Sequence, residues 1–228
     1  MRLLREWPPT TSSVRGRRSR AVVGGRRQAC GRGPPLGRRP QLVLRYDSWV
    51  ERVAVVGCIG AGKSTVARAL GRKLDIEVFH LDRYWWKPGR YRVTGRATVA
   101  ANTVEPDEFR RLEERIVAGD RWIVDGDAAN QGLRLSRADT VVFLDFPRWL
   151  CLWGLLQRHL KGSYDYPDGV RGSWRWVVFL ARWVWRTWPS QRRPRLVVAI
   201  SDHATNARIF HLRNRREVRS FLSADGTR

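Results

Sequence analysis

The sequence predicts an α/β fold with three layers, in which helices cover both faces of a parallel β-sheet. Short apolar runs rich in β-branched residues alternate along the chain with longer segments that have the spacing of amphipathic helices. Strands separated by helices pair in parallel, because each crossover returns the chain to the same edge of the sheet. A glycine-rich loop between the first strand and the first helix supports this assignment, since such loops bind phosphate.

Strands and helices are expected in the alternating order that this fold requires. The apolar runs predict strands at residues 52–56, 76–82, 121–125, 140–145 and 207–212. Helical spacing and capping signals predict helices at residues 65–74, 106–117, 147–159, 174–188 and 214–222. Pro106 opens the second of these helices, acidic residues follow in its first turn, and Gly119 stops it.

Two segments between these elements show no clear period. Residues 83–104 contain turn signals, so we expect a loop or a small insertion there. Residues 161–173 are rich in glycine, tyrosine and aspartate, and we expect them to be mobile. Together with the neighbouring helices they would form a small helical lid at about residues 158–188.

The lid would include a segment, residues 174–188, that carries five tryptophans. Its apolar residues follow helical spacing, while Arg175, Arg182 and Arg186 share the opposite face. This pattern favours a helix that packs on the core and turns its arginines toward a cleft. The alternative is a helix that binds a membrane surface or RNA.

The glycine-rich loop reads G-C-I-G-A-G-K-S and matches the phosphate-binding pattern G-x-x-x-x-G-K-S in full. Glycines allow the backbone to turn sharply and present N–H groups to phosphates, and the following helix N-terminus adds positive potential. Lys63 is expected to reach the β- and γ-phosphates, and the Ser64 hydroxyl is expected to bind Mg²⁺. The predicted ATP site comprises Gly57, Cys58, Ile59, Gly60, Ala61, Gly62, Lys63, Ser64 and Thr65.

Two acidic residues end predicted strands and should therefore lie near this loop, at the carboxyl edge of the sheet. Asp125 is predicted to hold Mg²⁺ through water. Asp82 is predicted to orient or deprotonate an acceptor hydroxyl, or to bind the acceptor. Either acid could instead cap a neighbouring turn, and a helix cap is the favoured role for Asp145, because Pro147 follows it.

Arginine side chains are candidates for stabilising a transferring phosphoryl group, which carries negative charge. Arg158 lies late in the helix that leads into residues 161–173, a position from which it could swing over the phosphates. Arg134, Arg137 and Arg148 are further candidates. The chain contains forty arginines, so any one of them can instead be a solvated or ion-paired side chain.

The formal net charge of +23 is unevenly distributed. Residues 1–45 hold twelve arginines and one acidic residue, and we expect a disordered basic extension there, or a start placed too far upstream. Residues 46–228 would form the phosphate-binding domain. A basic chain favours nucleotides, nucleic acid or an anionic surface as partners, although a bias toward arginine would give the same charge.

Cysteine usage and hydropathy limit the setting in which the protein works. The three cysteines, Cys30, Cys58 and Cys151, form no C-x-x-C pair, so we expect neither a disulfide framework nor a zinc knuckle. This usage fits a reducing cytoplasm. The sequence contains no apolar run of the roughly 18 residues needed to span a membrane.

From Arg52 to Leu222 the order of motifs resembles the P-loop nucleoside- and nucleotide-kinase group, the adenylate-kinase-like proteins. The motifs that carry this resemblance are residues 55–65, 79–83 and 123–126. Residues 137–148 and 212–218 resemble more narrowly a bacterial set described as adenylate-kinase-related or DNA topology modulation (flagellar regulation) proteins. The resemblance implies a P-loop NTPase fold and the use of ATP and Mg²⁺. By the same resemblance, Arg158 would be the lid-side arginine and Arg213 would lie near the adenine.

The sequence departs from adenylate kinases proper on the acceptor side. Asp125-Gly126 is followed by Asp127 rather than by Phe-Pro-Arg, and residues 83–104 offer no obvious match to the acceptor-side arginines. We therefore predict a cytoplasmic ATP-dependent phosphotransferase and name no acceptor. The alternative is a regulatory ATP-binding protein that acts on DNA or RNA through its basic surface, including the N-terminal extension.

Overall fold

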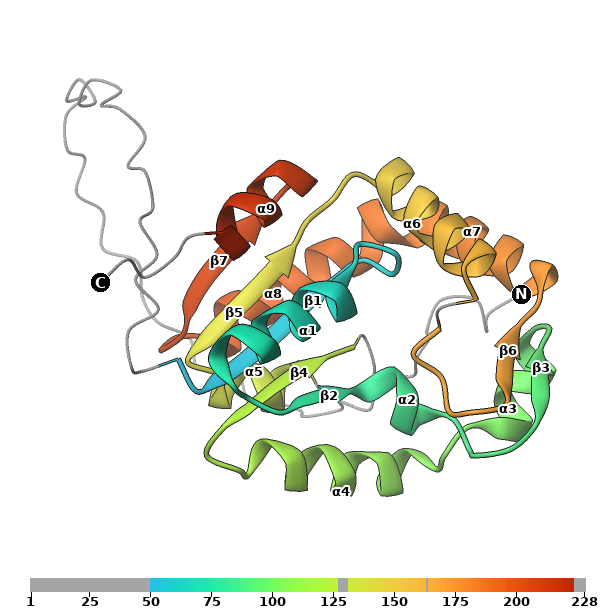
Figure 1. Cartoon of the computed structure of the whole chain (residues 1–228), viewed down its shortest axis with the longest axis horizontal. Coiled ribbons are helices and arrows are strands. Elements are labelled where there is room, and N and C mark those ends of the chain that lie inside the picture. Colours follow the sequence, from blue (N-terminus) through green and yellow to red (C-terminus); the bar gives the residue numbers. More distant parts are fainter. Residues whose placement is uncertain (1–49, 127–130, 163, 224–228) are drawn as a thin grey trace, which may run out of the picture.

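The computed structural model describes residues 50–126, 131–162 and 164–223 (Figure 1). The predictions for the basic extension at residues 1–45, for Cys30 and for Asp127 lie outside these described residues. Among the described residues, Cys58 and Cys151 are both buried and neither is in a disulfide.

The central element is a five-stranded sheet, and every neighbouring pair of its strands is parallel. The strand order across the sheet is β2-β4-β1-β5-β7, so β1 lies in the middle. These strands are β1 (Arg52–Gly57), β2 (Val78–His80), β4 (Trp122–Asp125), β5 (Thr140–Leu144) and β7 (Arg208–Leu212). The parallel sheet predicted from the sequence is therefore confirmed.

Helices lie on both sides of this sheet, which gives the three predicted layers (Figure 1). Helix α1 packs against α9 and helix α5 packs against α8. The helices are α1 (Lys63–Leu74), α2 (Leu81–Trp85), α3 (Arg96–Asn102), α4 (Pro106–Val117), α5 (Gln131–Arg137), α6 (Arg148–Leu160), α7 (Trp174–Thr187), α8 (Arg193–His203) and α9 (Arg215–Ser223), with a π-helical turn, η2 (Trp188–Arg192), between α7 and α8. No helix in the described part of the chain is long and apolar enough to cross a membrane.

The strand predicted at residues 76–82 is shorter in the structure, and Asp82 does not end it. Strand β2 pairs with β4 over three residues only, and the ladder stops at His80 because its partner Asp125 is the last residue of β4. The chain then turns into α2, whose first turn contains Asp82. Leu81 is fully buried beside it and fixes this turn against the core.

Regular structure also occurs in the segments expected to be irregular. Residues 83–104 contain the end of α2, strand β3 (Tyr91–Val93) and helix α3. Strand β3 pairs in parallel with β6 (Val170–Gly172), which belongs to the segment expected to be mobile. This second, two-stranded sheet joins the predicted lid to residues 91–93 (Figure 1). Helix α8 was not predicted. Its apolar residues at 196–200 follow one another without a break, so the sequence shows no helical spacing there, and Val197 and Val198 are exposed.

A fully buried ion pair connects helices α4 and α5. The Arg134 Nε atom lies 3.3 Å from Glu113 Oε1, and neither side chain has any exposed surface. Arg134 also donates from Nη1 to the carbonyl oxygen of Gly126, at 3.1 Å. Because the Arg134 side chain is fully buried and paired with Glu113, it cannot contact a phosphate at the surface. The prediction that Arg134 is a candidate for phosphate contact is therefore wrong.

Replacing Arg134 by Met should lower the free energy of unfolding by about 3–5 kcal/mol, because the substitution leaves the Glu113 carboxylate buried without its cation. The double variant Arg134→Met/Glu113→Leu should recover most of the loss, since no charge then remains in the interior. Urea unfolding of the wild type and both variants checks this. A double variant as unstable as the single one would contradict the electrostatic explanation.

Candidate functional site

The phosphate-binding loop has the local geometry that its sequence predicts. Strand β1 ends at Gly57, helix α1 begins at Lys63, and the loop between them folds tightly on itself. Gly60 and Gly62 have φ values of 83° and 90°, in the left-handed region that favours glycine. The N-terminus of α1 therefore faces the loop, and its free N–H groups and dipole attract anions.

The loop is pressed directly against the backbone of α6. A Cβ atom on Gly60 would lie 2.2 Å from the carbonyl oxygen of Cys151. A Cβ atom on Gly154 would lie 2.0 Å from the carbonyl oxygen of Gly60. Because no side chain fits between the two backbones, α6 determines the position of the loop.

Lys63 lies inside the curve of the loop and is 7% exposed. Its ammonium group donates to the carbonyl oxygens of Gly57 at 3.0 Å and Cys58 at 3.1 Å. The ammonium is thus held at the floor of the loop, in the region where a phosphate would approach.

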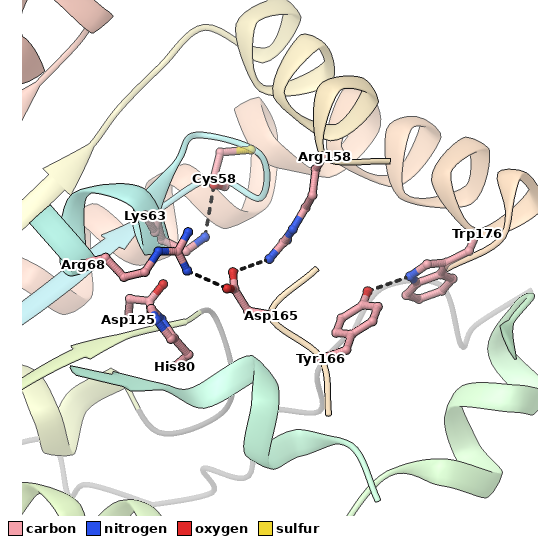
Figure 2. Close-up of polar contacts among 9 residues, drawn as sticks. All are labelled: Cys58, Lys63, Arg68, His80, Asp125, Arg158, Asp165, Tyr166 and Trp176. Carbon is pink, nitrogen blue, oxygen red and sulfur yellow. Dashed lines mark hydrogen bonds and ion pairs between the residues drawn. The ribbon is translucent and has the colours of Figure 1, made fainter. Parts of the chain in front are cut away.

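A carboxylate from the predicted lid lies at the mouth of the loop. The two oxygens of Asp165 accept hydrogen bonds of 2.7 Å from Arg68 Nη1 of α1 and from Arg158 Nη2 of α6 (Figure 2). Ser64, the second residue of α1, also lowers the pKa of this carboxylate. Burial acts to raise the pKa of Asp165, but the charge of Arg158 and the hydrogen bonds from Ser64 and Arg68 outweigh it and hold the pKa below its usual range.

Asp165 and Arg68 were not among the site residues predicted from the sequence. Their partners are distant in sequence, since Arg68 and Asp165 are separated by 97 positions. The available signal was weak: an aspartate between two tyrosines, seven residues after Arg158. In the structure, Tyr164, Asp165 and Tyr166 of this segment make specific contacts.

Aromatic side chains support the residue next to Asp165. Tyr166 stacks on Tyr164 with ring centroids 4.9 Å apart, and its hydroxyl accepts a 3.1 Å hydrogen bond from Trp176 Nε1 (Figure 2). Burial raises the pKa of Tyr166 to about 12, so the hydroxyl stays neutral at physiological pH. These contacts connect α7 to the segment that carries the carboxylate.

Asp82 and Asp125 both lie at the carboxyl edge of the sheet, as predicted. Asp125 is 2% exposed, and its carboxylate contacts Nδ1 of His80 (Figure 2). This hydrogen bond raises the pKa of His80 against the opposing effect of burial. Asp82 lies beside Gly126, where an added Cβ would be 3.6 Å from its Oδ1. Although burial acts to lower the pKa of Arg158, nearby groups that include Asp82 and Asp165 raise it.

The other predicted arginines contact groups of the protein itself. Arg213 directly follows β7 at the same edge of the sheet, and its backbone N–H donates to Glu217 Oε2 at 2.7 Å. Arg137 donates to the carbonyl oxygen of Val117 at 3.2 Å, and the Arg148 guanidinium lies 3.8 Å from the centre of the Trp185 ring.

Asp145 does not cap the following helix, so that prediction is wrong. Helix α6 begins after Pro147 without a side-chain cap. Asp145 instead accepts two 2.7 Å hydrogen bonds from Arg193 and contacts His211 Nε2 at 2.8 Å. The bidentate guanidinium is a stronger partner than a helix N–H group, which explains the outcome.

The side-chain oxygens at this edge of the sheet could ligate a metal ion that is bound together with a nucleotide. Within the described ranges, no cluster of three or more His, Cys, Asp or Glu residues could hold a metal by itself. Mg²⁺ is commonly bound through one or two protein oxygens, with phosphates and water completing its shell. The Ser64 hydroxyl and the Asp125 carboxylate have the chemistry for that kind of site.

Comparisons with known proteins give limited similarity. No protein-family model matches the chain. Over 112 residues the chain is 27% identical to the uncharacterized protein YqaC of Bacillus subtilis (strain 168), a match that covers 49% of this chain and 58% of that protein. The chain therefore spans little more than half the length of that relative.

Among solved structures, the chain is similar to shikimate kinases from Bacteroides thetaiotaomicron (18% identity, TM-score 0.40, covering 75% of this chain and 94% of that chain) and Aquifex aeolicus (17%, 0.33, 75% and 93%). It is also similar to the shikimate kinase from Acinetobacter baumannii in complex with shikimate (14%, 0.42, 76% and 89%). The sheet order and the loop of this chain define its fold independently of these similarities.

Replacing Gly154 by Ala should weaken nucleotide binding although Gly154 contacts no nucleotide. The added methyl group would overlap the Gly60 carbonyl and displace the loop, at a cost of about 1–3 kcal/mol in stability. Gly95→Ala is the matched control, since an added Cβ there meets nothing within 4 Å. Titration with a fluorescent ATP analogue measures the effect. Equal affinity in the two variants would show that α6 does not position the loop.

Proposed function

We propose that the protein is an ATP-dependent phosphotransferase that uses Mg²⁺ and transfers the γ-phosphoryl group to a small-molecule or nucleotide acceptor in the cytoplasm. One observation carries the proposal: Arg68 and Arg158 both donate to a single anion, the Asp165 carboxylate, at the mouth of the loop that holds Lys63. Two guanidinium groups that bind one anion, beside a loop that holds a lysine, have the electrostatic character that phosphoryl transfer requires.

Each part of the loop has a role in this proposal. The backbone N–H groups of Gly57–Thr65 hold the phosphates, together with the N-terminus of α1. Lys63 exchanges its bonds to the Gly57 and Cys58 carbonyls for the β- and γ-phosphates. Mg²⁺, bound by the Ser64 hydroxyl and through water by Asp125, would neutralise developing charge on the phosphate oxygens. The protein's share of catalysis is therefore positioning and charge stabilisation.

Asp165 occupies the position that the terminal phosphate would take. A carboxylate and a phosphate both accept hydrogen bonds from arginine in the same bidentate geometry, so the two anions compete for Arg68 and Arg158. Nucleotide binding then releases Asp165 and transfers both guanidinium groups to the phosphate. The segment at about residues 158–188 would act as a lid in this exchange.

The acceptor would enter beside Asp82. The carboxylate of Asp82 stands close to Gly126 and within electrostatic range of Arg158. It could accept the proton of an acceptor hydroxyl, or hold that hydroxyl in line with the phosphate. Arg213, at the end of β7, is proposed to lie near the adenine.

An ATP-consumption screen across nucleosides, nucleotides and small hydroxylated metabolites tests the proposal. We expect at least one compound to raise Mg²⁺-dependent ATP turnover well above the rate of hydrolysis. If no acceptor does so, and the protein instead binds nucleic acid with a steep salt dependence, it is a regulatory ATP-binding protein acting on DNA or RNA.

Substituting the two acids should separate their roles. Asp82→Asn should lower acceptor-dependent turnover by about 10²–10⁴-fold and spare Mg·ATP binding, because a positioned proton acceptor is typically worth that much. Asp125→Asn should weaken productive Mg·ATP binding with every acceptor and leave metal-free nucleotide binding largely intact. Initial rates at several Mg²⁺ concentrations, with basal hydrolysis measured in parallel, distinguish the two. Parallel losses in both variants would place both acids in the metal site.

Removing the charge of Asp165 should tighten nucleotide binding. In Asp165→Asn the nucleotide no longer displaces an anion held by two arginines, and we expect affinity to rise by about five- to tenfold. Asp168→Asn is the control, since Asp168 is an exposed acid three residues further along the same segment. Calorimetric titration with ADP checks both variants. Weaker binding in Asp165→Asn would mean that Asp165 assists the nucleotide instead of competing with it.

A further inference from the structure

Helices α6 and α7 carry most of the large apolar side chains that the described surface exposes. Six of the ten exposed large hydrophobic residues of the described chain lie on this helix pair: Trp149, Trp153, Leu160, Trp174, Val178 and Trp185. Trp149 is 64% exposed and Leu160 is 67% exposed, so these side chains project well into solvent. Exposed apolar surface of this extent on one structural unit indicates an interaction site.

These residues form one stripe on each helix. On α6, Trp149, Trp153 and Leu160 are separated by four and seven positions, which places them on a single helical face. On α7, Trp174, Val178 and Trp185 have the same separations. The buried faces of the two helices are formed by other residues: Cys151 and Leu155 on α6, and Trp176, Val177, Leu180, Trp183 and Val184 on α7. The exposed stripes are therefore not part of the core.

The two stripes adjoin across an antiparallel seam. The ring of Trp174, at the start of α7, lies 4.2 Å from the ring of His159, at the end of α6. The ring of Trp185, at the end of α7, lies 3.8 Å from the guanidinium of Arg148, at the start of α6. Helices α6 and α7 pack side by side (Figure 1), and Leu160 and Trp149 directly follow these seam residues on α6. The two stripes therefore form one surface, called here the α6/α7 face.

The charge on this face has one sign. Neither α6 nor α7 contains an acidic residue. Arg175, Arg182 and Arg186 are exposed on α7 among its tryptophans. A hollow of about 420 Å³ on α7 is lined by Trp174, Arg175, Val178, Phe179 and Arg182, so cationic and apolar side chains border the same depression. The structure thus exposes the arginines that the sequence analysis placed toward a cleft.

We propose that the α6/α7 face binds the surface of an anionic lipid bilayer. Tryptophan and leucine would enter the boundary between headgroups and acyl chains, where amphipathic aromatic rings are stable. The arginines would contact lipid phosphates, to which guanidinium is well matched. The helices would lie in the plane of the interface and would not cross it.

The observations favour a membrane over the other occupants. A second copy of this chain would bring together two faces without acidic residues on proteins that each carry a net charge of +23, and the two would repel. Nucleic acid offers phosphates and base faces but no aliphatic layer to receive Leu160 and Val178. The bilayer interface supplies both an anionic and an apolar partner.

Flotation of the full-length protein with lipid vesicles tests this proposal without reference to phosphotransfer. We expect binding to vesicles of phosphatidylcholine with about one third phosphatidylglycerol, and little binding to phosphatidylcholine alone. The basic extension at residues 1–45 is present in every variant, so differences between variants report on the α6/α7 face.

Two pairs of matched variants assign the binding to this face. Trp149→Ser/Trp153→Ser should lower the partition coefficient at least about tenfold. Its control, Val197→Ser/Val198→Ser, alters two exposed apolar residues of α8 and should bind normally. Arg182→Gln should lower binding about fivefold, while Arg111→Gln, an exposed arginine of α4, should have little effect. Thermal melting confirms that each variant is folded.

Three outcomes would overturn the proposal. The first is vesicle binding that is the same in the tryptophan variant and its control. The second is absence of binding to anionic vesicles by the wild type. The third is binding of single-stranded RNA that depends on Trp149 and Trp153 while vesicle binding does not, which would identify the face as a nucleic-acid surface. Loss of phosphotransfer activity in any variant would bear on the proposed function and not on this inference.

Discussion

The parallel register of β1 with β4 and β5 determines where the functional groups of this protein lie. Val55 is paired with Asp125 on one side of β1, and Gly57 is paired with Leu144 on the other. The three strands therefore end together, and the chain leaves each of them at the same edge of the sheet. Without that register, the loop that follows Gly57 and the buried Asp125 would not lie at the same edge of the sheet.

Helix α6 contacts the loop, the segment that carries Asp165, and helix α7. Its backbone at Gly154 fixes the loop through Gly60, and near its end Arg158 reaches the carboxylate at the loop mouth. A different face of the same helix contacts α7 through Arg148 and His159. Movement of α6 would therefore change the positions of Gly60, of Asp165 and of the α6/α7 face together.

The sequence predicted what depends on local pattern and missed what depends on distant pairing. The loop at Gly57–Ser64, the central strands and helix α4 were predicted, because spacing, glycine geometry and capping are local properties. Asp165 was missed because its partner Arg68 lies on another element, and no local pattern records that contact. The same limit explains the wrong prediction for Asp145. A helix cap was predicted, but Asp145 binds Arg193, which lies 48 positions away in the sequence. Strand β2 was predicted too long because its end is decided by β4.

Calorimetric titration of ATP into the wild type and into Lys63→Ala, followed by turnover with the best acceptor, tests whether the loop binds ATP for phosphoryl transfer. We expect Lys63→Ala to remain folded and to lose ATP turnover by about 10²-fold or more, because the ammonium is proposed to contact the transferring phosphoryl group. Lys87→Ala, which removes an exposed lysine elsewhere in the chain, should behave as the wild type. Normal ATP binding and turnover in Lys63→Ala would show that the loop is not the site of phosphoryl transfer.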